Sequence, residues 1–484
     1  MINNPSGQTH TQTGITLAEK VTQVFGNLVI NKQRLPASQL QKSGIPAYVG
    51  EWILDSIVPG NGELNPEEAN QAQYWASRYI SPPGDVNQIK NRLINGEVIK
   101  VLTPVNVEVE LSRRRQIRVA KLSLLGIGDA YISDMLIDQY PDLLNQGMWG
   151  VVQLINTEDG VTIESFKPMQ ATVNLGLYKN ARAEFSLEEW KSLLLISMGY
   201  NPDAFSAEEQ LFLLCRLLPL VQKNMHIMEL APKGTGKSYI YENINPRVRL
   251  VSGGNISPAV LFVNNASGQW GLLARFSVVV LDEVQTMKFE KPQEIIGGLK
   301  GYLANGKLTR GGLYETASDC SLVMLANINL DSNQLPVNSL LVNELPEFLR
   351  ETAFLDRIRG LIPGWKIQKL SGDCFSKSLG FKSDFFGDAL LAMRDDLEAD
   401  QMCERRIELV GKKIYKRNED AVKYIASGLV KILFPHLLLS DREFEYYCIR
   451  PAKQLRQYIW DQMQILDGEY RQYENDIRFE IIPE

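Results

Sequence analysis

The residues best suited to chemistry lie in two short stretches near the middle of the chain. Residues 231–238 read APKGTGKS, and residues 278–283 read VVVLDE. In the first stretch two glycines allow a tight turn whose N–H groups can face phosphate oxygens, and a lysine and a hydroxyl follow. The second stretch is an apolar strand that ends in two carboxylates. Together they predict a site that binds a nucleoside triphosphate with Mg²⁺ and hydrolyses it.

The order of the side chains assigns a role to each. Lys237 can reach the β- and γ-phosphates, while the hydroxyl of Ser238 and the carboxylate of Asp282 can hold Mg²⁺. Glu283 stands where a carboxylate can polarise the attacking water. A helix that begins near Lys237 would add its positive end to the same place. The nucleotide-binding residues expected in the loop are Gly234, Thr235, Gly236, Lys237 and Ser238.

One residue departs from the usual form of this loop. Ala231 stands where a glycine is typical, and it narrows the backbone conformations open to the first turn. A Gly-rich turn before a helix can also be an ordinary strand–helix connection. The carboxylate strand at 278–283 weighs against that alternative.

A further apolar run supplies a polar residue for the γ-phosphate. Residues 321–329 read SLVMLANIN, which predicts a buried strand followed by polar side chains. Asn327 fits a residue that senses the γ-phosphate and orients water, and Asn329 is the second choice. The alternative is a loop asparagine that supplies only turn chemistry.

Arginines later in the chain could complete the site. The segment 353–360, AFLDRIRG, follows a polar stretch, NELPEFLRET, that we expect to be a helix. Arg357 is the first choice for an arginine that stabilises transition-state charge on a neighbouring subunit's phosphates, and Arg350 and Arg359 remain open. Arg417, in a basic cluster of the C-terminal helices, is the residue that a lid would bring to the bound nucleotide. A solvated helix end explains Arg417 equally well.

The segments around these motifs predict a multidomain α/β protein. Helical patterns dominate the first hundred residues, period-two alternation follows, and strands then alternate with helices from about 206 to 370, as a parallel sheet requires. The expected divisions are a disordered lead at 1–15, a helical region at 16–97, a β-rich, barrel-like region at 98–180 with a polar loop at 141–147, a large ATPase subdomain at 181–375, a helical lid at 376–474 and a tail at 475–484.

The bulk composition argues against several classes of protein. The 484 residues are 44 % hydrophobic and 22 % charged, as in a globular protein with more than one core. The sequence shows no apolar run long enough for a bilayer and no signal peptide, so we expect a cytoplasmic protein without a membrane partner. Three histidines and five scattered cysteines argue against a zinc cluster. A net charge of −6 gives no global attraction to nucleic acid.

Two local basic segments could nevertheless contact DNA. Residues 91–121 carry seven basic and three acidic residues, and a turn between two strands of a small barrel is a suitable place for phosphate contacts. A hairpin expected within residues 295–312 would carry two more basic residues towards the pore of a ring. Solvated surface turns are the alternative for both segments. The candidate DNA-binding residues are Arg113, Arg114, Arg115, Arg118, Lys121, Lys307 and Arg310.

The chain resembles the BrxL family, the Lon-related ATPases of bacteriophage-exclusion (BREX) systems. The resemblance extends from the N-terminal helices into the lid. It rests on IPAYVGEWIL at 45–54, ESFKPMQ at 164–170, FSLEEWKSLLL at 185–195, GTGKS at 234–238, LVSGG at 250–254, LDEV at 281–284, NIN at 327–329, AFLDRIRGLIPGW at 353–365 and SGLVKILFPH at 427–436.

This resemblance implies an AAA+ P-loop core with a helical lid, preceded by a mixed helical and barrel-like DNA-binding region. It also implies a hexameric or similar ring, possibly stacked, that binds ATP and Mg²⁺ at subunit interfaces and acts on double-stranded DNA beside other BREX proteins. Longer members continue into a Lon-like domain with a Ser–Lys catalytic pair. Because this chain ends at Glu484, soon after the lid, we expect no peptidase activity. The alternatives are an ATP-assembled DNA scaffold or clamp with little turnover, and a remodeller of other defence proteins.

Overall fold

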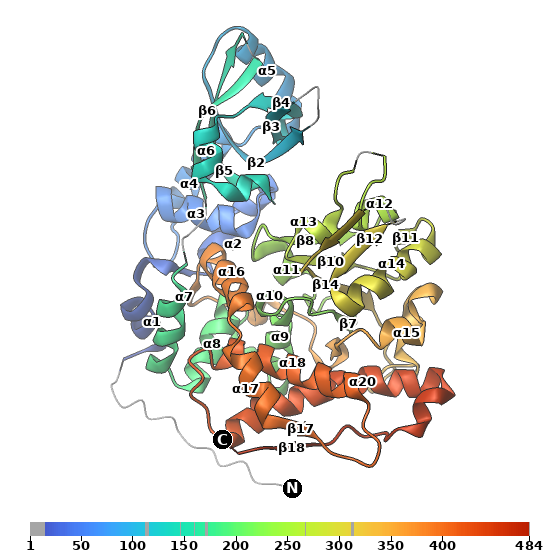
Figure 1. Ribbon diagram of the computed structural model, residues 1–484. Coiled ribbons are helices and arrows are strands. Elements are labelled where there is room, and N and C mark those ends of the chain that lie inside the picture. Colours follow the sequence, from blue (N-terminus) through green and yellow to red (C-terminus); the bar gives the residue numbers. More distant parts are fainter. Residues whose placement is uncertain are drawn as a thin grey trace.

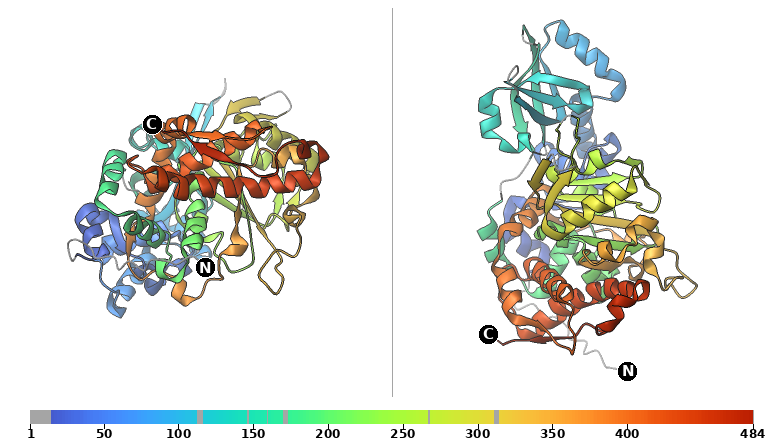
Figure 2. Two further views of the ribbon diagram at one scale, coloured as in Figure 1. Left: turned by 90° about the horizontal axis from the view of Figure 1, so that it is seen from below. Right: turned by 45° about the vertical axis from the view of Figure 1, so that its right-hand side comes forward.

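The computed structural model has three packed parts. In Figure 1 a small barrel stands at the top, N-terminal helices join it to the rest, and a large body with a central sheet and the C-terminal helices lies below. Figure 2 shows the barrel above the body in a second side view. The structure describes residues 15–111, 116–145, 147–158, 160–169, 173–266, 268–310 and 314–483.

Five helices make up most of the N-terminal region. Capping boxes begin two of them, formed by Thr16 with Glu19 and by Asn65 with Glu68. The helical prediction missed one short strand, β1 (Val29–Asn31), which pairs antiparallel with β16 (Leu379–Phe381). Three residues are too few for a period-two pattern, and the partner strand is far away in the sequence. The helices are α1 (Leu17–Phe25), α2 (Arg34–Ser38), α3 (Ala47–Ile57), α4 (Pro66–Tyr79) and α5 (Val86–Ile94).

Buried charges fix this region to the large body. Lys32 Nζ lies 2.7 Å from Glu51 Oε1, and both side chains are almost completely buried. The second oxygen of Glu51 accepts a hydrogen bond from the Ser383 backbone N–H at 2.6 Å. Ser383 is the first residue of α16 (Ser383–Ala392), so Glu51 satisfies one of the donors that a helix leaves free at its start.

Five strands form the closed barrel at the top of Figure 1, in the order β2-β3-β4-β6-β5. Burial alternates along β5, as the period-two pattern predicts. The polar loop predicted at 141–147 is in part a 3₁₀ turn over Pro141–Leu144, because Leu143 is fully buried in the barrel core. A short helix, α6 (Asp134–Gln139), precedes it. The strands are β2 (Ile99–Leu111), β3 (Gln116–Leu122), β4 (Ile127–Tyr131), β5 (Met148–Thr157) and β6 (Gly160–Pro168).

The large body is built on a parallel five-stranded sheet with the order β15-β7-β14-β10-β8. This confirms the α/β alternation predicted for the region. Strands β7, β10 and β15 are buried along their whole length, which is why they read as continuous apolar runs rather than alternating ones. The strands are β7 (Ile227–Ala231), β8 (Val248–Ser252), β10 (Val278–Asp282), β14 (Ser321–Asn327) and β15 (Gly360–Pro363).

Helices cover the sheet and lead into its strands. The helix α8 starts at the predicted capping box of Ser186 and Glu189. The predicted hairpin is present as β12 (Lys307–Arg310) and β13 (Tyr314–Ala317), directly after α14. Further helices of this part are α7 (Leu175–Ala181), α8 (Leu187–Ser197), α9 (Ala207–Cys215), α10 (Leu218–Val221), α11 (Tyr239–Asn243), α12 (Pro258–Leu261), α13 (Leu272–Arg275), α14 (Pro292–Asn305) and α15 (Thr352–Leu355).

The prediction of a helix for NELPEFLRET is wrong. The segment forms two separate 3₁₀ turns, Leu341–Glu344 and Glu347–Leu349. Pro346 lies between them, and it can neither donate a helical hydrogen bond nor leave the preceding residue in a helical conformation. Only the short helix α15 follows.

The C-terminal helices share one hydrophobic core with the sheet, whereas the barrel and the helices α2–α4 have cores of their own. A pair of short strands, β17 (Ile407–Leu409) and β18 (Phe479–Ile481), ties the end of the chain to these helices. Among the described residues, no helix is both long and apolar enough to cross a membrane. The remaining helices are α17 (Glu398–Arg406), α18 (Lys416–Leu433), α19 (Asp441–Glu443) and α20 (Arg450–Leu466).

Candidate functional site

The glycine-rich loop leaves the carboxyl end of β7, which lies between β15 and β14 in the sheet. Gly234 and Gly236 have φ angles of 88° and 67°, in the left-handed region that favours glycine. The helix expected to start near Lys237 starts at Tyr239 and has only five residues. Its dipole is therefore weaker than the sequence suggested, and the N–H groups of the loop itself must carry most of any phosphate binding.

Side chains from three neighbouring strands meet at this edge of the sheet. Lys237 Nζ donates to Asn327 Oδ1 at 2.7 Å, and Ser238 Oγ donates to Asp282 Oδ2 at 2.7 Å. Asp282 ends β10 and Asn327 ends β14, so parallel pairing brings both to the loop that follows β7. The structure thus joins four of the residues that the sequence singled out. Asn329 is exposed, two residues beyond the end of β14.

The backbone turns sharply at Glu283. Its φ angle is 54°, which is rare for a residue with a side chain. The other oxygen of Asp282, Oδ1, accepts a hydrogen bond from the Glu283 N–H at 2.9 Å and so supports the turn. Such strain concentrates at functional sites, where the surrounding structure holds a side chain in a required position. Here the strained residue is the half-buried Glu283, which directly follows Asp282 in the chain.

The donors at this edge fit Mg²⁺ bound together with a phosphate. In the part of the chain that the structure describes, no three His, Cys, Asp or Glu side chains are grouped so as to hold a metal by themselves. Mg²⁺ is commonly held by one or two protein oxygens, waters and phosphate oxygens, and Ser238 and Asp282 offer that set. Burial, and then the charge of Asp282, raise the pKa of Glu242. A cation at Asp282 would relieve this repulsion.

The neighbouring Gly364 explains how Ala231 is accommodated. Ala231 is fully buried at the end of β7. A Cβ atom built on Gly364 would overlap the Ala231 Cβ, and it would lie 2.8 Å from Glu229 Oε1 and 2.9 Å from the Leu230 carbonyl oxygen. The methyl group that the loop carries in place of a hydrogen therefore occupies space that Gly364 leaves open.

A cleft of about 340 Å³ is lined in part by residues of α11, the helix that follows the loop. Its lining is mainly apolar, and it includes Tyr239, the first residue of α11. Burial, and then the charge of Glu51, raise the pKa of Tyr239 to about 12. The N-terminal region and α11 both contribute to its walls, through residues that include Lys32, Leu35, Glu51, Gly199, Tyr239 and Phe375.

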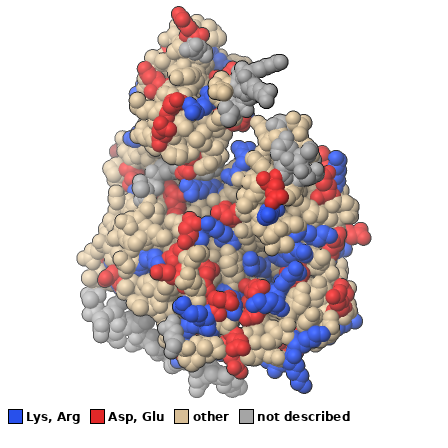
Figure 3. Space-filling model, viewed as in Figure 1, with Lys and Arg blue, Asp and Glu red and all other residues tan. Residues whose placement is uncertain are grey.

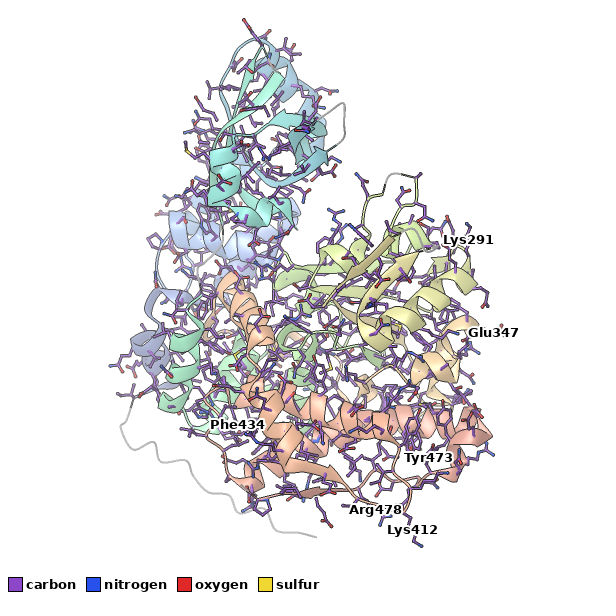
Figure 4. All side chains as sticks on the ribbon, in the orientation of Figure 1. Lys291, Glu347, Lys412, Phe434, Tyr473 and Arg478 are labelled. Atoms are coloured by element: carbon purple, nitrogen blue, oxygen red, sulfur yellow. The ribbon has the colours of Figure 1, made fainter. Side chains whose placement is uncertain are left out.

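The candidate arginines lie away from this edge. The N–H of Arg359 bonds to the carbonyl of His226, and Gly360 pairs with Ile227, the first residue of β7. This is the amino end of the strand, whereas the phosphate loop follows its carboxyl end. Arg357 precedes this point and its guanidinium donates to the Ala353 carbonyl. In Figures 1 and 4, α15 and Glu347 lie on the side of the body away from the N-terminal helices.

The two other arginines of this segment are held by their own chain. Arg350 Nε donates to the Leu345 carbonyl at 2.8 Å, and its Nη2 donates to the Asn343 carbonyl at 2.9 Å. Arg359 stacks on the Tyr424 ring with 4.1 Å between the guanidinium carbon and the ring centroid. Because Arg357 also donates to a carbonyl of its own chain, that of Ala353, these contacts do not decide among the three, and Arg357 stays the first choice from the sequence.

The structure does not bring Arg417 to the phosphate loop, contrary to the sequence-based expectation. Its guanidinium pairs instead with Asp356, the residue before Arg357. The fully buried Asp356 also accepts from Tyr415 Oη at 2.9 Å and from Arg456 Nη2 at 3.2 Å. A buried carboxylate needs several donors, and this one takes Arg417 as one of them.

The candidate DNA-binding residues are spread over the barrel and the hairpin. Arg118 pairs with Asp134, and Lys121 Nζ lies 2.6 Å from Glu108. The predicted triplet Arg113, Arg114 and Arg115 lies outside the described residues. On the hairpin, Lys307 Nζ lies 2.9 Å from Glu315, and Arg310 ends β12. Figure 3 shows basic and acidic side chains intermixed on the face in view, over both the barrel and the body.

Two family models together match most of the chain. The N-terminal model of the BREX system Lon protease-like protein BrxL matches residues 23–155, and the ATPase-domain model of Lon-like protease BrxL-like proteins matches residues 161–476.

Two relatives are similar in sequence to the chain over most of its length. The chain is 29 % identical to the Lon-like protease BrxL of Escherichia coli O9:H4 (strain HS), over 94 % of this chain and 66 % of that protein. It is 31 % identical to the Lon-like protease BrxL of Bacillus cereus (strain H3081.97), over 86 % of this chain and 62 % of that protein. The chain thus spans less than two thirds of the length of either relative. A full-length MCM homolog from Methanopyrus kandleri aligns over 75 % of this chain and 78 % of its own, at 14 % identity and a TM-score of 0.39.

The packing of Ala231 against Gly364 can be tested directly. We expect Gly364→Ala to destabilise the protein by about 1–3 kcal/mol through overpacking, and to weaken ATP binding because the base of the loop must move. Adding Ala231→Gly removes the contact with the Ala231 Cβ, one of the three close contacts, and should recover part of the lost stability and part of the lost ATP affinity. Thermal unfolding and titration with a fluorescent ATP analogue measure the two effects. Gly301→Ala is the matched control, since a Cβ at Gly301 meets no atom within 4 Å. A Gly364→Ala protein as stable as the parent contradicts the packing argument.

Proposed function

The chain belongs to the BrxL family, and from that premise we propose that it is an ATP-hydrolysing, DNA-binding AAA+ protein of a BREX antiphage defence system. The observation that carries the ATPase activity is the meeting of Lys237 with Asn327 and of Ser238 with Asp282 at one edge of the sheet. These contacts join the cation, the amide, the hydroxyl and the carboxylate that the hydrolysis of a triphosphate requires.

Each side chain has a place in this proposal. The loop N–H groups and Lys237 bind the β- and γ-phosphates, and Asn327 orients the γ-phosphate and the water. Ser238 and Asp282 hold Mg²⁺, which when bound neutralises charge on the phosphate oxygens. Glu283 accepts the proton of the attacking water. The cleft beside Tyr239 has room for the base and the sugar of ATP.

A second copy of the chain completes the site. Arg357 lies near the amino end of β15, so it is poorly placed for the phosphates bound by its own loop. We propose that it reaches the phosphates of a neighbouring subunit in a hexameric or similar ring, possibly one of two stacked rings. Arg417 would then help to hold the segment that carries Arg357, because it pairs with Asp356, the residue before Arg357.

We propose double-stranded DNA as the partner of the ring. The sequence between β2 and β3 contains three consecutive arginines, 113–115, and Arg118 and Lys121 follow on β3. These residues would contact backbone phosphates without reading the sequence. Lys307 and Arg310 on the hairpin would contact the same backbone inside the ring. Binding of this kind weakens steeply with salt.

Two other functions remain as alternatives, an ATP-assembled scaffold or clamp on DNA with little turnover and a remodeller of other BREX proteins. We propose no cleavage of peptide bonds, because the side chains that meet at the end of β7 are suited to phosphate chemistry. We further propose that the protein acts in the cytoplasm. A casein degradation assay beside the ATPase assay separates the two activities.

The turnover test uses Glu283→Gln. The amide keeps the shape of the side chain but cannot accept a proton, so we expect ATP hydrolysis to fall by at least about 100-fold while ATP binding remains. Lys237→Ala is the reference, because it should lose binding as well. Phosphate release and equilibrium binding measure the two properties. If the parent protein shows no turnover, even with DNA present, the scaffold alternative is favoured.

The DNA test replaces Arg113, Arg114 and Arg115 together with alanine. We expect weaker binding to duplex DNA and a slope of log affinity against log salt that is smaller by up to about 3, one unit for each lost phosphate contact. Fluorescence anisotropy at several salt concentrations measures this slope. The control replaces the exposed lid residues Arg442 and Arg450, which carry no proposed contact. An unchanged slope in the triple variant shows that the triplet does not contact DNA.

A further inference from the structure

A fully buried arginine lies behind the phosphate loop. Arg216 follows the last residue of α9, and its side chain is completely enclosed. Its Nη2 lies 2.6 Å from Glu229 Oε1 and its Nε lies 3.1 Å from Glu229 Oε2, a two-pronged pair. Glu229 is also fully buried, in the middle of β7. A charged residue inside this otherwise apolar strand is the one sequence signal that could have revealed the pair.

The remaining donors of Arg216 reach the loop itself. Nη2 donates to the Thr235 carbonyl at 3.2 Å, and Nη1 donates to the Gly236 carbonyl at 3.4 Å. Nη1 also donates to Tyr200 Oη at 3.0 Å, and this hydroxyl in turn donates to the Gly236 carbonyl at 3.3 Å. The five N–H groups of the guanidinium therefore match five hydrogen bonds.

This arrangement keeps Arg216 charged and in place. Burial alone would lower the pKa of its guanidinium, but the Glu229 carboxylate outweighs burial and raises the pKa above its ordinary value. Burial raises the pKa of Tyr200, so that its hydroxyl stays neutral and can donate. The backbone is anchored as well, because Tyr241 Oη donates to the Arg216 carbonyl at 2.9 Å.

The planarity of the peptide bond links these contacts to phosphate binding. In a trans peptide unit the C=O and the following N–H point in opposite directions. When Arg216 holds the carbonyls of Thr235 and Gly236, the N–H groups of Gly236 and Lys237 must point away from Arg216, towards the open side of the loop. Gly234 and Gly236 leave the backbone free to rotate, so an external anchor is needed to fix these directions.

We propose that Arg216 is a positioning residue for the phosphate loop, with Glu229 and Tyr200 as its supports. Arg216 fixes the orientation of two loop peptides so that their N–H groups face the phosphates of the nucleotide before it binds. The inference rests on the proposed ATPase function. Stability alone does not account for the pair, because replacing a buried ion pair by apolar residues of similar size is often neutral or stabilising.

The test replaces both partners, Arg216→Met with Glu229→Met. Removing both charges leaves no unpaired ion in the core, so we expect a folded protein with a thermal midpoint close to that of the parent. With the two carbonyls released, we expect ATP affinity to fall by about 10- to 100-fold, since small misplacements of binding groups have effects of that size. Binding of a fluorescent ATP analogue, with KM and kcat measured separately, gives the readout.

Two further variants keep the test decisive if the double methionine variant does not fold or if its effect is not specific. Arg216→Lys keeps a charge for Glu229 but cannot also hold both carbonyls, so it should show the binding defect even if the double methionine variant does not fold. Replacing Lys431 and Asp400, a pair 2.8 Å apart in the C-terminal helices, with methionine is the matched control and should leave ATP affinity unchanged.

The outcomes separate this inference from the function on which it rests. If the parent binds ATP and Lys237→Ala does not, the nucleotide site is established. A folded Arg216→Met/Glu229→Met protein with the affinity, KM and kcat of the parent then overturns the role of Arg216 alone. If the parent itself binds no ATP, the proposed function fails first.

Discussion

Parallel pairing of three buried strands is the constraint on which the candidate site depends. Strands β7, β14 and β10 lie side by side, and parallel strands end at the same edge of their sheet. This edge therefore receives the loop after β7, Asp282 from β10 and Asn327 from β14, close enough for hydrogen bonds of 2.7 Å. The residues that make the strands apolar also fix their register, because each of these strands is buried almost throughout.

The sequence was sufficient for features that depend on short segments. The apolar runs before Ala231, Asp282 and Asn327 were predicted as strands because burial on both faces demands continuous apolar residues. The capping box at Ser186 and the hairpin after α14 are equally local. The missed features depend on contacts between distant segments, namely the pairing of β1 with β16, the turn at Pro141–Leu144 that buries Leu143, and the partner that Gly364 provides for Ala231. A single sequence records neither which strands are neighbours nor where a buried charge finds its partner.

The arginines also show that a single sequence does not reveal the partner of a charged side chain. Arg417 looked like a lid residue for the bound nucleotide because it lies in a basic cluster, yet it pairs with Asp356. Asp356 joins the segment that carries Arg357 to three donors, Arg417 of α18, Arg456 of α20 and Tyr415, which directly precedes α18. A shift of these helices on nucleotide binding would therefore reach Arg357. In the proposed ring, such a shift would link the state of one site to the arginine offered to the next. The N-terminal helices are tied in through Glu51, which lines the cleft beside Tyr239.

The central claim is that one subunit supplies the phosphate loop and its neighbour supplies Arg357. The most direct measurement mixes two inactive variants, Lys237→Ala and Arg357→Ala, and follows ATP hydrolysis by the mixed rings. Some interfaces then join an intact loop to an intact arginine, about a quarter of them if subunits mix at random. We expect the mixture to regain up to about a quarter of the parent activity. Activity that stays at the level of the separate variants, in rings shown to exchange subunits, contradicts it.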